Sequence, residues 1–497
     1  MNYKSTRDSG VIVSAAQAII QGISKEGGLF VPESTPWLSY DDIKMLAESD
    51  YVNRAKKILG FFLTDFSDDE IMDCVSKAYN REKFETESIT PLYMIENNVF
   101  ILELWHGPTC AFKDIALQLL PHLLSVSIEK SGEKKTVIIL VATSGDTGKA
   151  ALEGFKDVQN TKIMVFYPEN GVSPMQKLQM NTMDGSNVYV CSIKGNFDDA
   201  QNAVKSILTN NNINEKLNTN DMLFSSANSI NWGRLVPQIV YYISAYCDLI
   251  KNNKITCGEQ INVVVPTGNF GNILAAYYAK KMGIPINKLI CASNSNNVLT
   301  EFFQNGVYDK NRPFYSTISP SMDILISSNL ERLLYDLSGC DDKVLVTWMN
   351  ELSQNGKYEV NEQIKNKINE NFWAGYCDED ETKKTIKDMF DKNSYVFDPH
   401  TAVAVNVYQQ YKEKTADFTK TIIASTASPF KFSGDVLDAL IGESQNMDEF
   451  EKINELSKLS MLVPPKQIVS IKDKEIRFFD SCEKSDIKNY ILEKLGL

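Results

Sequence analysis

Two loops that join a strand-like run to a helical pattern contain residues suited to holding anions. In the first, the apolar run 261–265 leads into Pro-Thr-Gly-Asn-Phe-Gly-Asn at 266–272. Two glycines at such a turn let the backbone approach an anion closely, and the free amides of the helix start then face it. The loop has no Lys or Arg, so the main chain would hold the anion. The alternative is a tight turn that needs positive φ and binds nothing.

The second loop, Thr-Ser-Gly-Asp-Thr-Gly at 143–148, follows the apolar run 136–142 in the same way. Hydroxyls and amides at the start of a helix suit a carboxylate ligand. Asp146 adds an acid that can accept or share a proton. A plain helix cap made by Ser or Asp is the alternative interpretation. Neither loop matches the GxGxxG dinucleotide fingerprint or the GxxxxGK phosphate loop.

Lys113 is the candidate nucleophile. It stands at the predicted start of an apolar helix that contains Ile115, Leu119 and Leu123. A cation is normally disfavoured at a helix N-terminus, and apolar neighbours favour the neutral amine. A neutral lysine is what Schiff-base formation requires, although an ordinary surface lysine fits the same pattern. Nearby Cys110 has no His/Asn partner pattern, so we interpret it as a core residue.

Two further segments are rich in polar residues. Ser-Ser-Ala-Asn-Ser-Ile-Asn-Trp-Gly-Arg at 225–234 includes Arg234, whose planar guanidinium could clamp a phosphate. Its Asn and Ser residues could equally be helix caps. Ser-Thr-Ala-Ser-Pro-Phe-Lys-Phe at 425–432 follows the last strand-like run and brings hydroxyl groups to that position.

Apolar, β-branched runs that alternate with helical patterns must position these residues. Runs so continuously apolar are buried on both faces, which indicates a parallel sheet flanked by helices. Ligands of such sheets bind beyond the carboxyl ends of the strands, where the loops above lie. The predicted strands are 136–142, 162–167, 187–193, 261–265, 288–292 and 421–424, and the predicted helices are 148–157, 173–183, 197–208, 232–250 and 272–282.

The regions on either side of this core have a different sequence pattern, helical and more charged. The first stretch, to about residue 90, has a largely helical pattern, and Ser67 with Glu70 forms a capping box. The charged segment 335–393 is helical in pattern and is interpreted as an insertion or a peripheral helical subdomain. We therefore divide the chain into an N-terminal region 1–92, a catalytic core of two subdomains 93–442, and a C-terminal tail 443–497 that packs on the core.

Composition excludes several classes of function. The 497 residues include 51 basic and 64 acidic side chains, a net charge of −13, so we expect no nucleic-acid partner. Nine scattered cysteines without a CxxC pair indicate free thiols in a reducing compartment. Three histidines without HExxH indicate no metal site. No apolar run reaches the roughly 18 residues of a membrane helix, and no signal pattern is present. We expect a cytoplasmic protein without a membrane partner.

In their order along the chain, these segments resemble the threonine synthase family of pyridoxal 5'-phosphate enzymes, in the tryptophan-synthase-β-like (fold type II) group. The resemblance covers nearly the whole chain. GISKEGGLFVP and SSNLERLL separate it from the serine/threonine dehydratases and cysteine synthases. It implies an α/β fold of two parallel-sheet subdomains flanked by helices, with an N-terminal helical region and a helical insertion. The motifs outside the loops above are STR at 5–7, GISKEGGLFVP at 22–32, HGPTCAFKD at 106–114, SPSMDI at 319–324, SSNLERLL at 327–334 and DPHTAVA at 398–404.

The resemblance also implies roles for individual residues. Lys113 matches the lysine that forms the Schiff base with the cofactor, and Thr426 matches the hydroxyl that bonds the pyridine nitrogen, which directs the reaction type. The cofactor-phosphate loop is matched by Gly268, Asn269, Phe270, Gly271 and Asn272. The loop that binds the substrate carboxylate and approaches the cofactor ring is matched by Ser144, Gly145, Asp146 and Thr147, of which we assign Asp146 to the cofactor. The substrate-phosphate side is matched by Asn228, Ser229, Asn231 and Arg234.

The implied reaction is the conversion of O-phospho-L-homoserine and water to L-threonine and phosphate. A phospho-lyase that releases 2-oxobutyrate, or a non-catalytic relative, are the alternatives. The only implied partner is this small-molecule substrate, in a monomer or homodimer. The chain departs from the family pattern at Ser428 and Phe430, where many relatives have His and Ala, and at Lys149; no role is assigned to these three residues.

Overall fold

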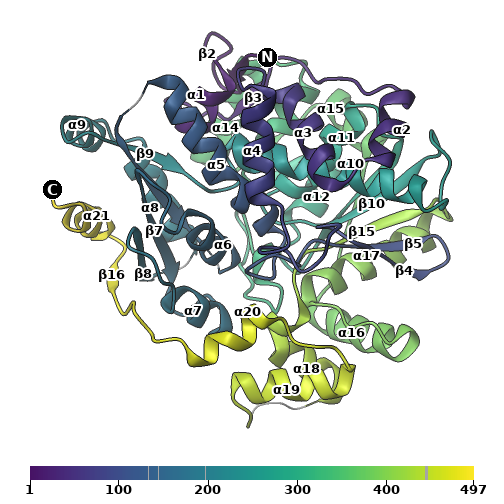
Figure 1. Ribbon diagram of the computed structural model, residues 1–497. Helices are drawn as coiled ribbons and strands as arrows, with labels where there is room; N and C mark the ends of the chain where they lie inside the picture. The colour runs from purple at the N-terminus through teal and green to yellow at the C-terminus, as the bar shows by residue number, and fades with distance from the viewer. Residues whose placement is uncertain (133, 144, 196, 443–445) are drawn as a thin grey trace.

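Two sheets divide the chain into two lobes (Figure 1). The computed structural model describes residues 1–132, 134–143, 145–195, 197–442 and 446–497. The predicted fold of two parallel-sheet subdomains flanked by helices is confirmed. Within the described residues, no helix is both long and apolar enough to cross a membrane.

The larger sheet has six strands in the order β14-β11-β10-β15-β5-β4, parallel except for β4, which pairs antiparallel with β5. The predicted strands 261–265, 288–292 and 421–424 correspond to its centre. The bounds are β4 Leu92–Glu96, β5 Val99–Glu103, β10 Ile261–Pro266, β11 Ile286–Ser293, β14 Phe372–Tyr376 and β15 Thr421–Ser425.

The smaller sheet has five strands, all parallel, in the order β16-β8-β7-β6-β9. Its central strands are buried on both faces: Val137, Ile139 and Val141 of β6 belong to one apolar cluster, and Ile138 and Leu140 to another. Burial on both faces is the reason that the sequence shows an unbroken apolar run. The bounds are β6 Thr136–Ala142, β7 Thr161–Pro168, β8 Val188–Lys194, β9 Met222–Ser226 and β16 Ser481–Glu483.

Long buried helices join the two lobes. Helix α5 packs against α6 of the smaller lobe and against α10, which in turn packs against α11 beside the larger sheet. Both α5 and α10 are buried along most of their length. The helices around the sheets are α5 Lys113–Ser131, α6 Asp146–Phe155, α7 Pro174–Asn181, α8 Phe197–Leu208, α9 Asn211–Thr219, α10 Trp232–Lys251, α11 Gly271–Lys281, α12 Val298–Asn305, α13 Leu330–Leu337, α17 Pro399–Thr415 and α18 Ser433–Ile441.

The N-terminal region is largely helical, as predicted, and also contains a small antiparallel sheet that the sequence pattern did not reveal. The predicted capping box at Ser67 is present, because the Ser67 hydroxyl accepts from the Glu70 amide and the Glu70 carboxylate accepts from the Ser67 amide. The elements are β1 Tyr3–Ser5, β2 Ile12–Val13, β3 Phe30–Pro32, α1 Ala15–Gln21, α2 Tyr40–Glu48, α3 Tyr51–Phe62 and α4 Asp68–Ala78.

The segment 335–393 contains the expected helices but is not only peripheral. Its strand β14 pairs in parallel with β11 and completes one edge of the larger sheet. The charged helices on either side hide this short strand in the sequence. The other elements of the segment are α14 Asp342–Asn355, β13 Lys357–Glu359, which pairs with β12 Val307–Asp309, α15 Glu362–Asn371 and α16 Glu379–Asn393.

The C-terminal tail runs from the larger lobe to the smaller one (yellow in Figure 1). Helix α19 packs on α18, and β16 then pairs in parallel with β8 at the edge of the smaller sheet. The tail is therefore part of both lobes, and the domain boundaries at 92 and 442 stay a proposal. Its other elements are α19 Glu449–Ser460, α20 Lys466–Val469 and α21 Ile487–Leu495.

Candidate active site

The loops that follow β6, β9, β10 and β15 meet at one cavity between the two lobes. This is the position at which parallel sheets bind ligands. Eleven of the residues predicted for the site line the cavity: Lys113, Thr147, Asn228, Ser229, Arg234, Gly268, Asn269, Phe270, Gly271, Asn272 and Thr426. Gly145, Asp146 and Asn231 do not line it, and Ser144 lies outside the described residues.

Lys113 is the first residue of α5, and its side chain is buried at the cavity. Its Nζ donates to Ser321 Oγ at 3.1 Å and lies 3.9 Å from Asp146 Oδ2. Burial lowers the pKa of Lys113 to about 8, with Lys431 and Arg234 acting in the same direction and Asp146 opposing them. The site therefore keeps a substantial share of this amine neutral, as nucleophilic or base chemistry requires.

Asp146, at the start of α6, is held as a carboxylate by a buried ion pair. Its Oδ1 lies 2.6 Å from Lys431 Nζ and accepts from Gln176 Nε2 at 2.9 Å. Burial raises the pKa of Asp146, but the charges of Lys431 and Lys113 outweigh burial and hold this pKa well below its usual range. Asp146 is thus a fixed negative charge behind Lys113, which makes it unsuited to donate a proton.

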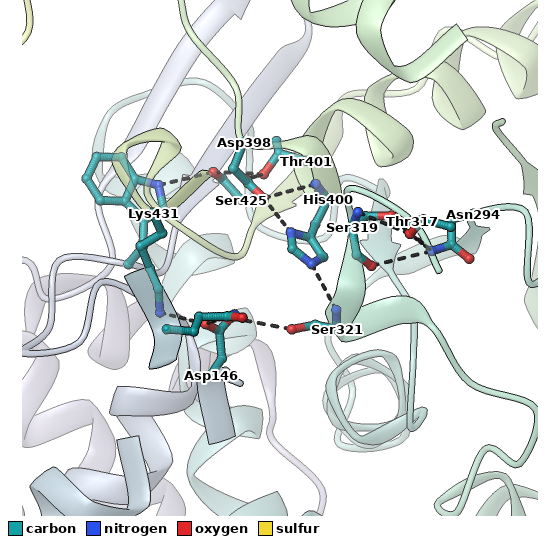
Figure 2. A network of polar contacts seen from close by, with 12 residues as sticks. Asp146, Asn294, Thr317, Ser319, Ser321, Asp398, His400, Thr401, Ser425 and Lys431 are labelled. Carbon is teal, nitrogen blue, oxygen red and sulfur yellow. Dashed lines mark hydrogen bonds and ion pairs between the residues drawn. The ribbon is translucent and has the colours of Figure 1, made fainter. Parts of the chain in front are cut away.

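A chain of hydrogen bonds supports Ser321 from the opposite side (Figure 2). The Ser321 amide donates to His400 Nε2 at 3.2 Å, and His400 Nδ1 lies 2.8 Å from Asp398 Oδ1. Because Nε2 accepts from this amide, Nδ1 is the ring nitrogen that donates toward Asp398. Thr401 also donates to Asp398. The network fixes the backbone that presents Ser321 Oγ to Lys113.

The loop 266–272 after β10 has the geometry of an anion site. No described residue accepts a hydrogen bond from the backbone amides of 268–272, which lie at the start of α11. Phe270 has φ +64°, so the chain turns sharply into the helix. Asn272 Oδ1 accepts from the hydroxyls of Tyr241 and Tyr242 at 2.5 and 2.6 Å, which leaves its Nδ2 buried without a described partner. These unpaired donors suit a phosphate group.

Two carbonyls of the same loop accept hydrogen bonds from the segment 327–329. Ser327 Oγ donates to the Gly268 carbonyl at 2.8 Å, and the Asn329 amide and Nδ2 donate to the Asn269 carbonyl at 3.1 and 3.0 Å. A Cβ on Gly268 would lie 2.3 Å from the Ser321 carbonyl oxygen, so only glycine fits there. The loop is therefore braced from behind with its amides turned to the cavity.

The residues predicted for the substrate phosphate separate into two groups. Arg234 is buried, its Nη1 donates to the Ala227 carbonyl, and its Nε has no described partner. Asn228 Oδ1 is also without a described partner. Asn231, in contrast, caps α10 and donates to the carbonyls of Ile19 and Ser226, so every polar group of its side chain is used inside the fold. Arg234, Asn228 and Ser229 can meet a ligand, whereas Asn231 holds the loop.

Thr426 follows β15 and is buried at the cavity beside Lys113. Its carbonyl accepts from the Phe112 amide at 2.9 Å, which joins the end of the strand to the start of α5. The preceding Ser425 Oγ accepts from Trp105 Nε1 at 3.1 Å and lies 3.1 Å from Thr401 Oγ1. The strand end therefore has a fixed position relative to Lys113.

Sequence reasoning gave no role to four residues that the fold brings to the site: Ser321, His400, Gln238 and Lys431. All but Gln238 lie in motifs that carried the family resemblance, and that membership was the signal that could have found them. The three departures from the family pattern are structural. Ser428 accepts from the Phe430 amide at the start of a 3-10 turn, Phe430 is in the core, and Lys149 is buried within α6 and pairs with Glu153 at 2.9 Å.

Family models match almost the whole described chain in three parts: threonine synthase N terminus at 2–79, pyridoxal-phosphate dependent enzyme at 65–362, and threonine synthase C-terminal at 401–474. The threonine synthase of Saccharomyces cerevisiae is 35% identical over 99% of this chain and 98% of its own length. The human protein named threonine synthase-like 1 is 41% identical over 89% of this chain, which spans only 59% of that relative.

Solved structures agree with these sequence matches. The crystal structure of yeast threonine synthase superposes with a TM-score of 0.87 at 33% identity, over 100% of this chain and 99% of that one. A structure described as pyridoxal-phosphate-bound threonine synthase from Brucella melitensis gives a TM-score of 0.84 at 34% identity, over 99% of both chains.

Proposed function

The chain belongs to the threonine synthase family of pyridoxal-phosphate-dependent lyases, and we propose that it converts O-phospho-L-homoserine and water to L-threonine and phosphate. One observation carries the proposal. Lys113 Nζ, with its pKa lowered to about 8, faces a cavity that has unpaired anion donors on two sides: the amides of 268–272, and Arg234 with its free Nε. Two such donor sets suit a substrate and a cofactor that each carry a phosphate.

In this proposal the cofactor phosphate is bound by the amides of Gly268, Asn269, Phe270, Gly271 and Asn272. Their unpaired state and the dipole of α11 support the assignment. Thr426 bonds the pyridine nitrogen through its hydroxyl, and a hydroxyl leaves that nitrogen unprotonated more readily than a carboxylate would. Asp146 stays anionic beside Lys113 and orients the amine through charge.

When bound, the cofactor supplies an electron sink for negative charge that develops at the substrate α- and β-carbons. Lys113 Nζ accepts the α-proton of the substrate and later the β-proton, and it returns protons as the reaction proceeds. Ser321 Oγ, 3.1 Å from Lys113 Nζ, keeps the amine aimed into the cavity. Arg234, Asn228 and Ser229 bind the leaving phosphate, and Thr147, which lines the cavity, binds the substrate carboxylate together with Ser144.

The site also fits elimination to 2-oxobutyrate, since that reaction needs the same lysine and the same anion donors. The test is to incubate the purified, cofactor-loaded protein with O-phospho-L-homoserine and quantify threonine, 2-oxobutyrate and phosphate. Equal amounts of threonine and phosphate are expected. Phosphate with 2-oxobutyrate would make the protein a phospho-lyase, and no phosphate release would support a non-catalytic relative.

Lys113→Ala tests the residue itself. The variant is expected to lose turnover and the absorbance band of lysine-linked cofactor, while its unfolding transition stays cooperative. Turnover that persists in Lys113→Ala would refute the assignment. We also propose that the protein is cytoplasmic, which its nine free cysteines support, and that it acts as a monomer or homodimer.

A further inference from the structure

A second cavity, about 400 Å³ in volume, lies outside the active site. Its lining comes from several parts of the chain: Arg7 and the segment 23–29 near the N-terminus, helix α8, Ile230, the segment 308–310, the segment 326–331, helix α14 and Tyr358. Several lining residues, such as Asn202, Ser206 and Ser353, are exposed, so the cavity opens to the surface. Neither the candidate active site nor the proposed reaction uses it.

The charged residues of this cavity are unlike those of the whole protein. Its lining includes three cations, Arg7, Lys205 and Lys310, and one carboxylate, Glu331. Arg7 and Glu331 neutralise each other through two hydrogen bonds, of 3.0 and 2.7 Å. No described residue forms an ion pair or hydrogen bond with Lys310 Nζ. In a chain of net charge −13, the unneutralised charge of Lys310 makes this cavity a local attractor for anions.

Only a thin partition separates this cavity from the active site. A third, very small cavity shares Lys205, Ile230 and Ser328 with the outer cavity. It shares Asn228 and Ser229 with the active site. The loop proposed to bind the substrate phosphate therefore has the active site on one side and the cationic cavity on the other. Ser328 Oγ, in the partition, is buried without a described hydrogen-bond partner.

We propose that the outer cavity is an antechamber, a second anion site that takes small phosphate monoesters before they reach the active site. This inference rests on the proposed function, because it identifies the ligand as the phosphorylated amino acid of that reaction. Lys310 attracts the phosphate electrostatically. Ser328 Oγ offers it a hydrogen bond on the way to Ser229 and Asn228. Inorganic phosphate, the product, has the same chemistry and can leave by the same path.

An antechamber changes the capture of substrate but not the chemical step. Lys310→Glu is therefore expected to lower kcat/KM for O-phospho-L-homoserine by about fivefold to tenfold and to leave kcat unchanged. The loss should shrink at high ionic strength, since salt screens the attraction. The matched control is Lys254→Glu, an exposed lysine outside the cavity that changes net charge equally; less than about a twofold effect is expected there.

A second measurement does not depend on turnover. Crystals of the cofactor-loaded protein are soaked in tungstate, a phosphate analogue that its anomalous signal locates. A tungstate ion is expected between Lys205 and Lys310 in the wild type and not in Lys310→Glu, while an ion near Arg234 persists in both.

The outcomes separate the two hypotheses. Absence of tungstate from the outer cavity, or equal kinetic effects of Lys310→Glu and Lys254→Glu, would overturn the antechamber. A parallel fall of kcat and kcat/KM would also overturn it. If the wild type forms no threonine, the proposed reaction fails, and the tungstate experiment alone then decides whether the outer cavity binds anions.

Discussion

The loops after β6 and β10 share one design and differ in charge. Each follows a buried parallel strand, begins with a threonine, passes a glycine and enters a helix at the cavity. After β6, the helix N-terminus has its own anion: Asp146 is the first residue of α6, and the Thr143 hydroxyl accepts from the amides of Gly145 and Gly148, each at 2.9 Å. After β10, the amides of 268–272 have no described acceptor.

This difference indicates which loop needs a ligand. At a helix N-terminus that contains a carboxylate and a hydroxyl acceptor, these side chains balance the positive end of the helix dipole and accept hydrogen bonds from the free amides. A helix N-terminus whose amides are unpaired and buried is stabilised by a bound external anion. The loop after β6 therefore sets the charge behind Lys113 and presents Thr147 to the cavity, whereas the loop after β10 presents the amides of 268–272 to an anion. Four measurements test this contrast.

The largest expected effect concerns the charge of the β6 loop. Lys431→Met removes the cation that pairs with Asp146 at 2.6 Å and leaves a buried carboxylate short of its main partner. The free energy of unfolding should fall by about 3–5 kcal/mol in urea denaturation. The double variant Lys431→Met/Asp146→Asn should recover part of that loss. A double variant no more stable than Lys431→Met would contradict the charge-setting role.

The second effect concerns the binding loop. Gly268→Ala places a Cβ 2.3 Å from the Ser321 carbonyl oxygen, so the loop must move. We expect cofactor affinity, measured by fluorescence titration, to fall about 100-fold, since a displacement of about 1 Å can cost that much. In Gly271→Ala the Cβ meets its nearest neighbour, Asn329 Nδ2, at 3.4 Å, and a smaller loss is expected. Equal losses in both variants would argue against a braced loop.

The third effect is a pH dependence at Lys113, which lies beside the carboxylate of the β6 loop. Its pKa is lowered to about 8, so the neutral amine is lost as pH falls through 8. The rate at which cofactor-free protein takes up the cofactor should rise about tenfold from pH 7 to pH 9. Asp146 raises this pKa, so Asp146→Asn should shift the profile to lower pH. A shift to higher pH would contradict the assignment.

The smallest expected effect is on stability, and it is measured by replacing each of the two threonines that begin the loops. Thr143→Val removes an acceptor from two buried amides and should cost about 1–2 kcal/mol of unfolding free energy. Thr267→Val removes only a donor to the Val265 carbonyl, 2.8 Å away, and should cost less than about 1 kcal/mol. Guanidinium unfolding of the two variants measures the difference. A greater loss in Thr267→Val would reverse the comparison.

The sequence predicted the strands at the centre of each sheet well and the strands at or next to a sheet edge poorly. The run 136–142 coincides with β6, because burial on both faces leaves a continuous apolar signal. Strand β5, with one charged end, β9, partly exposed, and β14, between charged helices, gave no such signal. Their positions depend on pairing with partners distant in the sequence, which a local pattern does not encode.

The candidate site shows the same division. Lys113 and the loop 266–272 were found because their types and spacing are local. Ser321 was not assigned a role, because its role depends on a hydrogen bond with Lys113, which lies 208 positions away in the sequence. Lys431 was missed for the same reason: nothing around it in the sequence indicates a buried carboxylate opposite. The assignment of Asn231 to the substrate was drawn from a motif, and its side chain is used within the fold instead.

Strand β16 has a consequence for how the chain is made. It pairs with β8 and closes one edge of the smaller sheet, although Glu483 follows its partner Lys194 by 289 positions. During synthesis from the N-terminus, β8 therefore has an unpaired edge until residues 481–483 have left the ribosome. Such an edge invites pairing with other chains. The tail therefore protects the smaller sheet, since β8 has an exposed edge in any molecule that lacks residues 481–483.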